Sequence, residues 1–171
     1  MALSFSVIET TMTPLWDFGW FDLTQFKVDG PAAERRDCYH VLAEFLRDPI
    51  SQRSFCDPSQ WGESIQHHGP FLCDRLVVEW FRPITCDQLK EQIRAALDDP
   101  EFTVPPNIEQ REPVEGWAAA ARARGDDVFV LDAPDQAEAK VDWDFVWSVY
   151  REFASLSPDR EELAIGVIGY D

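Results

Sequence analysis

The chain has little basic charge and no long hydrophobic run. Lysine and arginine together number 15 against 32 aspartates and glutamates, which gives a net charge of −17 at pH 7. A field of this sign repels phosphate groups, in nucleic acids and in anionic lipids alike, and it attracts cations and basic proteins. No stretch approaches the ~18 consecutive apolar residues of a membrane-spanning helix. We therefore expect neither a nucleic-acid partner nor a membrane partner.

The N-terminal part lacks the features of a secretory signal. No lysine or arginine precedes Lys27, and Glu9 interrupts the first apolar stretch. A signal needs a basic start and an apolar middle, so the expected location is the cytoplasm. In that reducing compartment all four cysteines are expected to remain free thiols. They are Cys38, Cys56, Cys73 and Cys86.

Motifs of common enzymes and metal sites are missing as well. The chain contains no Gly-x-Ser-x-Gly, no Gly-x-x-x-x-Gly-Lys and no Gly-x-Gly-x-x-Gly. Zinc-ligand pairs of the forms Cys-x2–4-Cys and His-x3–5-His are also absent. The adjacent His67 and His68 diverge on a helix and on a strand, so we expect their imidazoles to hydrogen-bond locally. These absences predict no catalytic residue, no metal ion and no cofactor.

Apolar and aromatic residues are abundant, with 12 phenylalanines and 7 tryptophans among 171 residues. A chain of this length buries roughly 70% of its extended surface, which is enough for a hydrophobic core. We expect a single acidic domain over residues 1–171. The aromatic cluster 16–21 is expected to belong to the core rather than to a binding surface.

Four segments are predicted to be helical, because apolar side chains recur in them every three or four residues. They are 33–47, 85–99, 113–124 and 142–155. Thr85 begins a capping box with Gln88, and Gly125 suits a left-handed C-cap. The pair Ser157-Pro158 indicates a further helix start.

Short runs rich in valine, isoleucine and aromatic residues predict strands over 76–81, 127–131 and 164–170, with a weaker fourth over 5–11. No tight hairpin signal joins these strands. The order of elements predicts an α+β fold, a single domain in which a small mixed sheet of about four strands packs with about four helices. A three-layer α/β arrangement is the alternative.

Negative charge is concentrated between residues 126 and 147, where one base, Lys140, stands against seven acids. The acids are Asp126, Asp127, Asp132, Asp135, Glu138, Asp142 and Asp144. Because they divide among a strand, a loop and a helix start, folding is expected to gather them on one rim beside Trp143. Fields of one sign steer oppositely charged partners. We predict that these acids and Trp143 bind a partner.

Size, charge and missing chemistry together predict an acidic protein-binding or inhibitory protein that recognises a basic protein partner. A bacterial immunity protein that neutralises a cationic toxin fits this description, because an acidic face can occupy a basic cleft as a phosphate backbone would. One alternative is an enzyme in which carboxylates between Asp126 and Asp144 hold a divalent cation. Another is a structural subunit of a larger complex, whose acidity serves solubility. The sequence does not indicate the oligomeric state.

Overall fold

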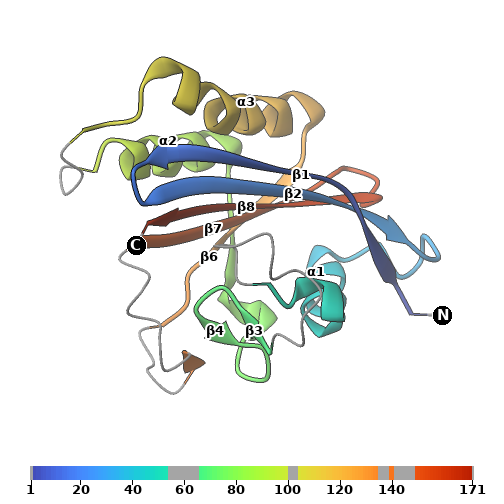
Figure 1. The fold of residues 1–171 in the computed structure, drawn as a ribbon. Helices are drawn as coiled ribbons and strands as arrows, with labels where there is room; N and C mark the ends of the chain where they lie inside the picture. Colours follow the sequence, from blue (N-terminus) through green and yellow to red (C-terminus); the bar gives the residue numbers. More distant parts are fainter. Residues whose placement is uncertain (1, 54–65, 100–103, 135–138, 141–148, 171) are drawn as a thin grey trace.

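An antiparallel sheet of six strands forms the centre of the structure, a computed structural model that describes residues 2–53, 66–99, 104–134, 139–140 and 149–170 (Figure 1). The strands are β1 (Ser4–Trp16), β2 (Gly19–Asp29), β5 (Phe81–Ile84), β6 (Asp127–Leu131), β7 (Val149–Leu156) and β8 (Glu162–Tyr170). Their order across the sheet is β1-β2-β8-β7-β6-β5. The strand that comes last in the chain therefore lies between β2 and β7. Two short strands, β3 (His67–His68) and β4 (Phe71–Leu72), form a separate antiparallel pair.

Helices cover both faces of the sheet (Figure 1). On one face lies α1 (Cys38–Arg47), and on the other lie α2 (Cys86–Leu97) and α3 (Ile108–Arg124). Single 3-10 turns follow α1 at Pro49–Ser51 (η1) and precede β5 at Val78–Trp80 (η3). None of the helices in the described residues is long and apolar enough to cross a membrane.

The alternation of side chains along the strands divides the interior into two cores. Phe26 of β2 faces α1, where its ring centroid lies 5.0 Å from that of Phe45. Phe21 of the same strand faces α3, where it lies 5.9 Å from Trp117. Side chains of this size contribute roughly 1.5–3 kcal/mol each when fully buried. The sheet is therefore held from both sides rather than from one.

The helix termini follow the capping signals of the sequence. Thr85 Oγ1 accepts from the Gln88 N–H at 3.1 Å, and the Gln88 side chain accepts from the Thr85 N–H at 2.8 Å. Gly125 ends α3 in the left-handed region, with φ 76° and ψ 37°. These two predictions are confirmed. The third helix starts earlier than expected, because Asn107 forms a second capping box with Gln110 and places Pro113 inside the helix.

The prediction of one fold that combines helices with a sheet is confirmed, but the described residues form three α-helices instead of about four, and the sheet differs from the expected one. It has six strands instead of about four, and every neighbouring pair is antiparallel, so it is not mixed. The strand β2 was not expected. It follows β1 through a two-residue turn, Asp17-Phe18, since Trp16 opposes Gly19 in register. Neither turn residue has a positive φ, so the turn carries no Asn-Gly or Asp-Gly signal.

The helix predicted over 142–155 is wrong for its second part, because Val149–Leu156 is the strand β7 (residues 141–148 lie outside the described ones). The second half of β7, residues 153–156, is buried on both faces. Phe153 packs towards Trp117 while Ala154 belongs to the core on the α1 side. A strand buried on both faces reads as an apolar run, which periodicity alone does not distinguish from a helix.

Two smaller predictions also need correction. Residues 76–81 do not form a strand: η3 occupies Val78–Trp80, and β5 begins only at Phe81. Pro83 lies within β5, which an edge strand tolerates. The segment after Leu156 is not a helix start but the turn between β7 and β8. There the Arg160 N–H donates to the Ser157 carbonyl at 2.8 Å.

Candidate functional site

The predicted partner-binding acids are only partly brought together in the described structure. Asp126 is buried and receives two hydrogen bonds from Arg124, at 2.6 and 3.1 Å. Asp127 is exposed and pairs with Arg160 at 3.1 Å. Asp132 lies beyond the other end of β6, where it pairs with Arg82 at 3.2 Å. The remaining members of the set lie outside the described residues. They are Asp135, Glu138, Asp142, Trp143 and Asp144.

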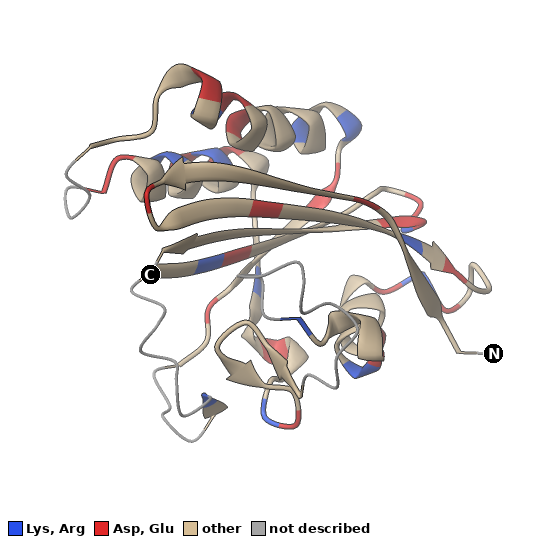
Figure 2. Cartoon of the chain, in the orientation of Figure 1, with Lys and Arg blue, Asp and Glu red and all other residues tan. Residues whose placement is uncertain are grey.

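Asp126 and Asp127 belong instead to a larger charged surface at the turn between β7 and β8, where Figure 2 shows several acids close together. Asp127 opposes Leu156 in register, directly before this turn. The loop before α1 reaches the same place, because Arg35 binds Glu161 at 2.7 Å. We call this surface the β7–β8 rim. Its acids are Asp29, Asp37, Asp126, Asp127, Asp159, Glu161 and Glu162, and its bases are Lys27, Arg35, Arg124 and Arg160.

Most acids of the β7–β8 rim were not predicted from the sequence. The acids that were not predicted come from the end of β2, the loop before α1 and the final hairpin. The contact of Arg35 with Glu161 joins positions 126 residues apart. No local pattern of charge predicts such a contact, because the contact depends on which strands are neighbours in the sheet.

Arginines across the described part of the chain are engaged with carboxylates of the protein itself. Nine of them form ion pairs within 4 Å: Arg35, Arg47, Arg75, Arg82, Arg94, Arg111, Arg122, Arg124 and Arg160. Each such pair contributes only about 0–1 kcal/mol to stability when it is exposed. Its effect on the field is larger, since each paired guanidinium is neutralised at close range.

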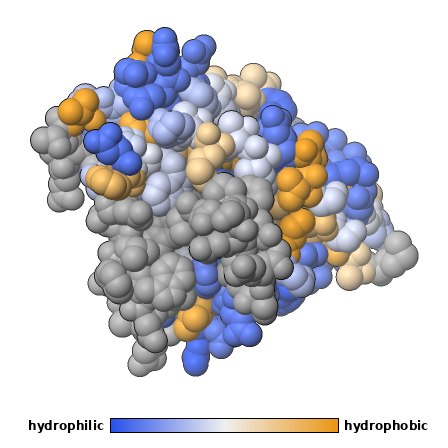
Figure 3. All heavy atoms as spheres, viewed as in Figure 1, coloured by the Kyte–Doolittle hydropathy of each residue, from blue (hydrophilic) through white to orange (hydrophobic). Residues whose placement is uncertain are grey.

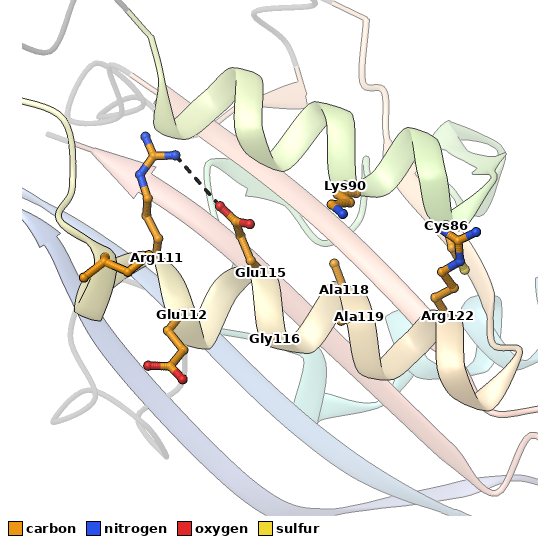
Figure 4. Close-up of a pocket in the computed structure, with 10 residues that line it drawn as sticks. Cys86, Lys90, Arg111, Glu112, Glu115, Gly116, Ala118, Ala119 and Arg122 are labelled. Carbon is orange, nitrogen blue, oxygen red and sulfur yellow. Dashed lines mark ion pairs between the residues drawn. The ribbon is translucent and has the colours of Figure 1, made fainter.

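A groove of about 550 Å³ lies between α2 and α3 (Figure 4). Lys90 on α2 and Arg122 on α3 approach it, together with Glu115, which pairs with Arg111 at 3.9 Å. Small residues of α3, including Gly116, form part of its wall. The charges along the groove are of both signs, so it does not select a ligand by charge alone.

The most concentrated group of buried ionisable side chains lies on the α1 face of the sheet. Asp22 on β2 and Glu152 on β7 both oppose Val167 of β8 in register. The two carboxylates therefore lie in one row across the sheet, with β8 between them. Both are completely buried. Glu152 accepts from the Tyr150 hydroxyl at 2.5 Å and contacts His68 Nε2 at 2.8 Å.

The contacts of the His68 imidazole favour its charged form. Its Nδ1 lies 2.6 Å from the Ser51 carbonyl, which only accepts, so Nδ1 carries a proton. Its Nε2 faces the Glu152 carboxylate. Burial alone lowers the pKa of His68, but the charge and hydrogen bond of Glu152, with that of Ser51, raise this pKa above the ordinary value. The proton on Nδ1 and the raised pKa both favour the charged form of the imidazole.

Arg53 and Asp22 form the second half of this buried group. The guanidinium of Arg53 lies over the Phe26 ring, 5.9 Å from its centroid. Burial raises the pKa of Asp22, while Arg53 and a 2.9 Å hydrogen bond from Thr24 oppose that rise. These contacts tie residues 51–53 and β3 to the sheet. The geometry is that of a structural clamp, since the two carboxylates and His68 are sealed from solvent.

Sequence reasoning missed this clamp. His67 behaves as predicted, because its Nδ1 contacts the Gly69 carbonyl two residues away at 3.0 Å. His68 does not, since its main partner, Glu152, is 84 residues away. The one available signal was polarity, because Asp22 and Thr24 interrupt an otherwise apolar run on β2.

Cysteine and metal chemistry add little to the described surface. Cys38, Cys73 and Cys86 are free thiols, as predicted, and burial raises the pKa of Cys73 to about 11. Cys56 lies outside the described residues. Among the residues that are described, no group of three or more histidine, cysteine, aspartate or glutamate side chains is placed to hold a metal ion.

No protein-family model matches the chain, and no curated protein or solved structure is significantly similar to it.

Proposed function

We propose that this protein is an acidic binding or inhibitory protein that recognises a basic protein partner. A protein that neutralises a cationic toxin, as an immunity protein does, is one form of this function. The proposal rests on the negative net charge and on the excess of acids over bases, and not on a set of catalytic residues.

The observation that carries the proposal is the distribution of ion pairs. With 32 acids against 15 lysines and arginines, the chain has 17 more carboxylates than ammonium and guanidinium groups. Nine arginines of the described residues are already paired with internal carboxylates. The charge that remains for a partner is therefore negative, and a negative surface accelerates the encounter with a basic protein.

Two surfaces supply exposed acids for such a partner. One is the β7–β8 rim, which has seven acids and four bases and includes the exposed Asp127. The other begins at the exposed Asp132, which follows β6. Acids of the rim that pair internally, such as Glu161 with Arg35, can exchange that weak exposed pairing for a partner's cation.

The test is affinity capture of the partner from the native host, followed by association kinetics over a salt series. A basic partner whose association rate falls at least tenfold between about 0.05 and 0.5 M salt is expected, because the Debye length shrinks to a few ångströms. An acidic partner, or a basic one whose association rate does not depend on salt, would refute the proposal.

A further inference from the structure

The two edges of the six-stranded sheet differ in how they are protected against pairing. β5 is four residues long and contains Pro83 and the exposed Arg82, two features that prevent strand addition. β1 is 13 residues long and carries a single charged side chain, Glu9. Val7 and Ile8 of β1 are 47% and 52% exposed, and Figure 3 shows hydrophobic surface over this part of the molecule. Within the described residues, the β1 edge is therefore the open one.

The backbone groups that β1 presents outward follow from Pro14. Its carbonyl accepts from the Gln110 side chain of α3 at 3.2 Å, so this carbonyl points away from β2. Proline has no N–H, which fits the same outward position. In a strand, the N–H and C=O of one residue share a side and alternate from residue to residue. The register with β2 is regular from Glu9 to Pro14, so the N–H and C=O groups of Thr10 and Met12 also point outward.

The hairpin turn leads to the same assignment. Trp16 and Gly19 close a two-residue turn, which places the backbone groups of Gly19 towards β1. Alternation along β2 then directs Phe21 and Leu23 towards β1 as well. Their partners are Thr13 and Thr11, whose backbone groups are thereby used within the sheet.

Both ends of this open stretch are closed. On one side, the register shift between Val7 and Glu9 leaves Ile8 in a bulge, which interrupts regular pairing. On the other side, Gln110 occupies the Pro14 carbonyl. The open stretch is therefore Glu9–Thr13, with two outward N–H groups and two outward carbonyls.

We propose that this stretch pairs with the same stretch of a second copy of the chain, antiparallel, about a two-fold axis through Thr11. In this register Thr10 opposes Met12 of the partner subunit, and the symmetry repeats the pair. Each hydrogen-bonded antiparallel pair exchanges two bonds, so all four outward groups of each chain are satisfied. An axis through Thr10 would place Met12 against the bulge. An axis through Met12 would place Thr10 against Pro14, which has no N–H.

Charge favours a second copy over a basic protein at this edge. Glu9 is the only charged side chain among the first 16 residues of a chain that carries a net −17. Two copies therefore meet least repulsion here, and a basic partner finds no row of carboxylates. In the proposed register Glu9 opposes Thr13 of the partner subunit, so the two glutamates do not face each other. Thr11 opposes itself, and threonine pairs across strands are favourable.

The first test is sedimentation equilibrium up to about 0.5 mM protein, a range suited to the weak association of so small an interface. A monomer–dimer equilibrium that tightens between 0.1 and about 0.5 M salt is expected, because salt screens the repulsion between acidic copies. The variant Thr11→Lys should weaken the dimer at least tenfold, since it sets two ammonium groups against each other. Ser4→Lys adds the same charge on β1 outside the open stretch, opposite Asp29, and should leave the equilibrium within about twofold of the parent.

A cross-linking test checks the register itself. Across the axis, the Cα atoms at position 11 would lie about 4.5 Å apart, close enough for a disulfide. Mild oxidation of Thr11→Cys should give a covalent dimer in good yield, above the background of the parent cysteines. Thr13→Cys is the control, because its two copies would lie roughly 13 Å apart. Equal yields from the two variants would refute the register, and a monomer at every concentration would refute the dimer.

This inference is independent of the basic partner proposed above, and the two respond to salt in opposite directions. Strand addition by a different protein is an outcome that would also overturn it. In that case the Thr11→Lys variant would lose the foreign protein while the parent chain alone stayed monomeric.

Discussion

His68 and Glu152 are joined inside the protein by a contact of 2.8 Å between the imidazole Nε2 and the carboxylate Oε1, and both side chains are fully buried. The contact connects β3 to the middle of β7. Removing one partner of a buried ion pair leaves the other charge without compensation, which costs several kcal/mol. The pair is therefore a point at which a small chemical change should have a large effect on stability.

The variant Glu152→Gln should lower the free energy of unfolding by about 2–4 kcal/mol, because it leaves the imidazolium of His68 facing a neutral amide. The midpoint of thermal unfolding should fall by roughly 6–12 °C for a chain of this size. The neighbouring Arg151 is exposed, so Arg151→Gln is a matched control and should change stability by less than about 0.5 kcal/mol. Equal effects of the two variants in urea or thermal unfolding would show that the buried pair has no special role.

The same pair should make stability depend on pH. The pKa of His68 is raised in the folded state, so the native protein retains a proton that the unfolded chain releases near pH 6.5. The contribution of the pair is complete below about pH 6.5 and is lost as the pH rises through the folded-state pKa. Urea unfolding between pH 6 and 9 should show a steeper loss of stability in the parent than in Glu152→Gln. Parallel curves would contradict a raised pKa.

Charge neutralisation tests the predicted partner-binding segment. The triple change of Asp132, Asp135 and Asp142 to asparagine should slow association with the basic partner about tenfold at low salt, with a smaller effect on dissociation. A control with the same change of net charge replaces Glu91, Glu109 and Glu112, exposed acids of α2 and α3, by glutamine. If the control slows association equally in surface plasmon resonance, the effect belongs to the total charge and not to this segment.

Two glycines of the α3 region should respond in opposite directions to the same substitution. Gly125 has φ 76°, a conformation that side chains disfavour, so Gly125→Ala should destabilise the protein by about 1 kcal/mol. Gly116 lies within α3, and an added Cβ there would meet nothing within 4 Å. Gly116→Ala should therefore stabilise by about 0.5–1 kcal/mol. Changes of the same sign in the two variants would contradict the helix end at Gly125.

The helices could be predicted because their signals are local. Thr85 and Gln88 are three residues apart, and Gly125 directly follows the last turn of α3, so each signal lies within the element that it describes. The sheet was harder. The second half of β7 is buried on both faces, and its apolar residues resemble part of a helix, whereas the buried Asp22 and Thr24 give β2 the polarity of a loop.

The charged surfaces show the same limit. A net charge of −17 predicts the sign of a partner, and it does not predict which acids are neighbours. Asp126 and Asp127 are adjacent in the chain and stay together at the β7–β8 rim. Glu161 joins them only because β6, β7 and β8 are consecutive in the sheet. Pairings of this range follow from topology, which the sequence pattern did not specify.

The central position of β8 determines when the sheet can be completed during synthesis on the ribosome. β8 follows every other strand in the chain, yet it lies between β2 and β7. The β1–β2 hairpin can form early. The edge of β2 that will pair with β8 then stays unpaired while more than a hundred further residues are synthesised. The six-stranded sheet is complete only when Glu162–Tyr170 has emerged and pairs with both β2 and β7. Until then the nascent chain exposes the hydrophobic faces of β2, so its need for chaperone protection should be greatest just before β8 emerges.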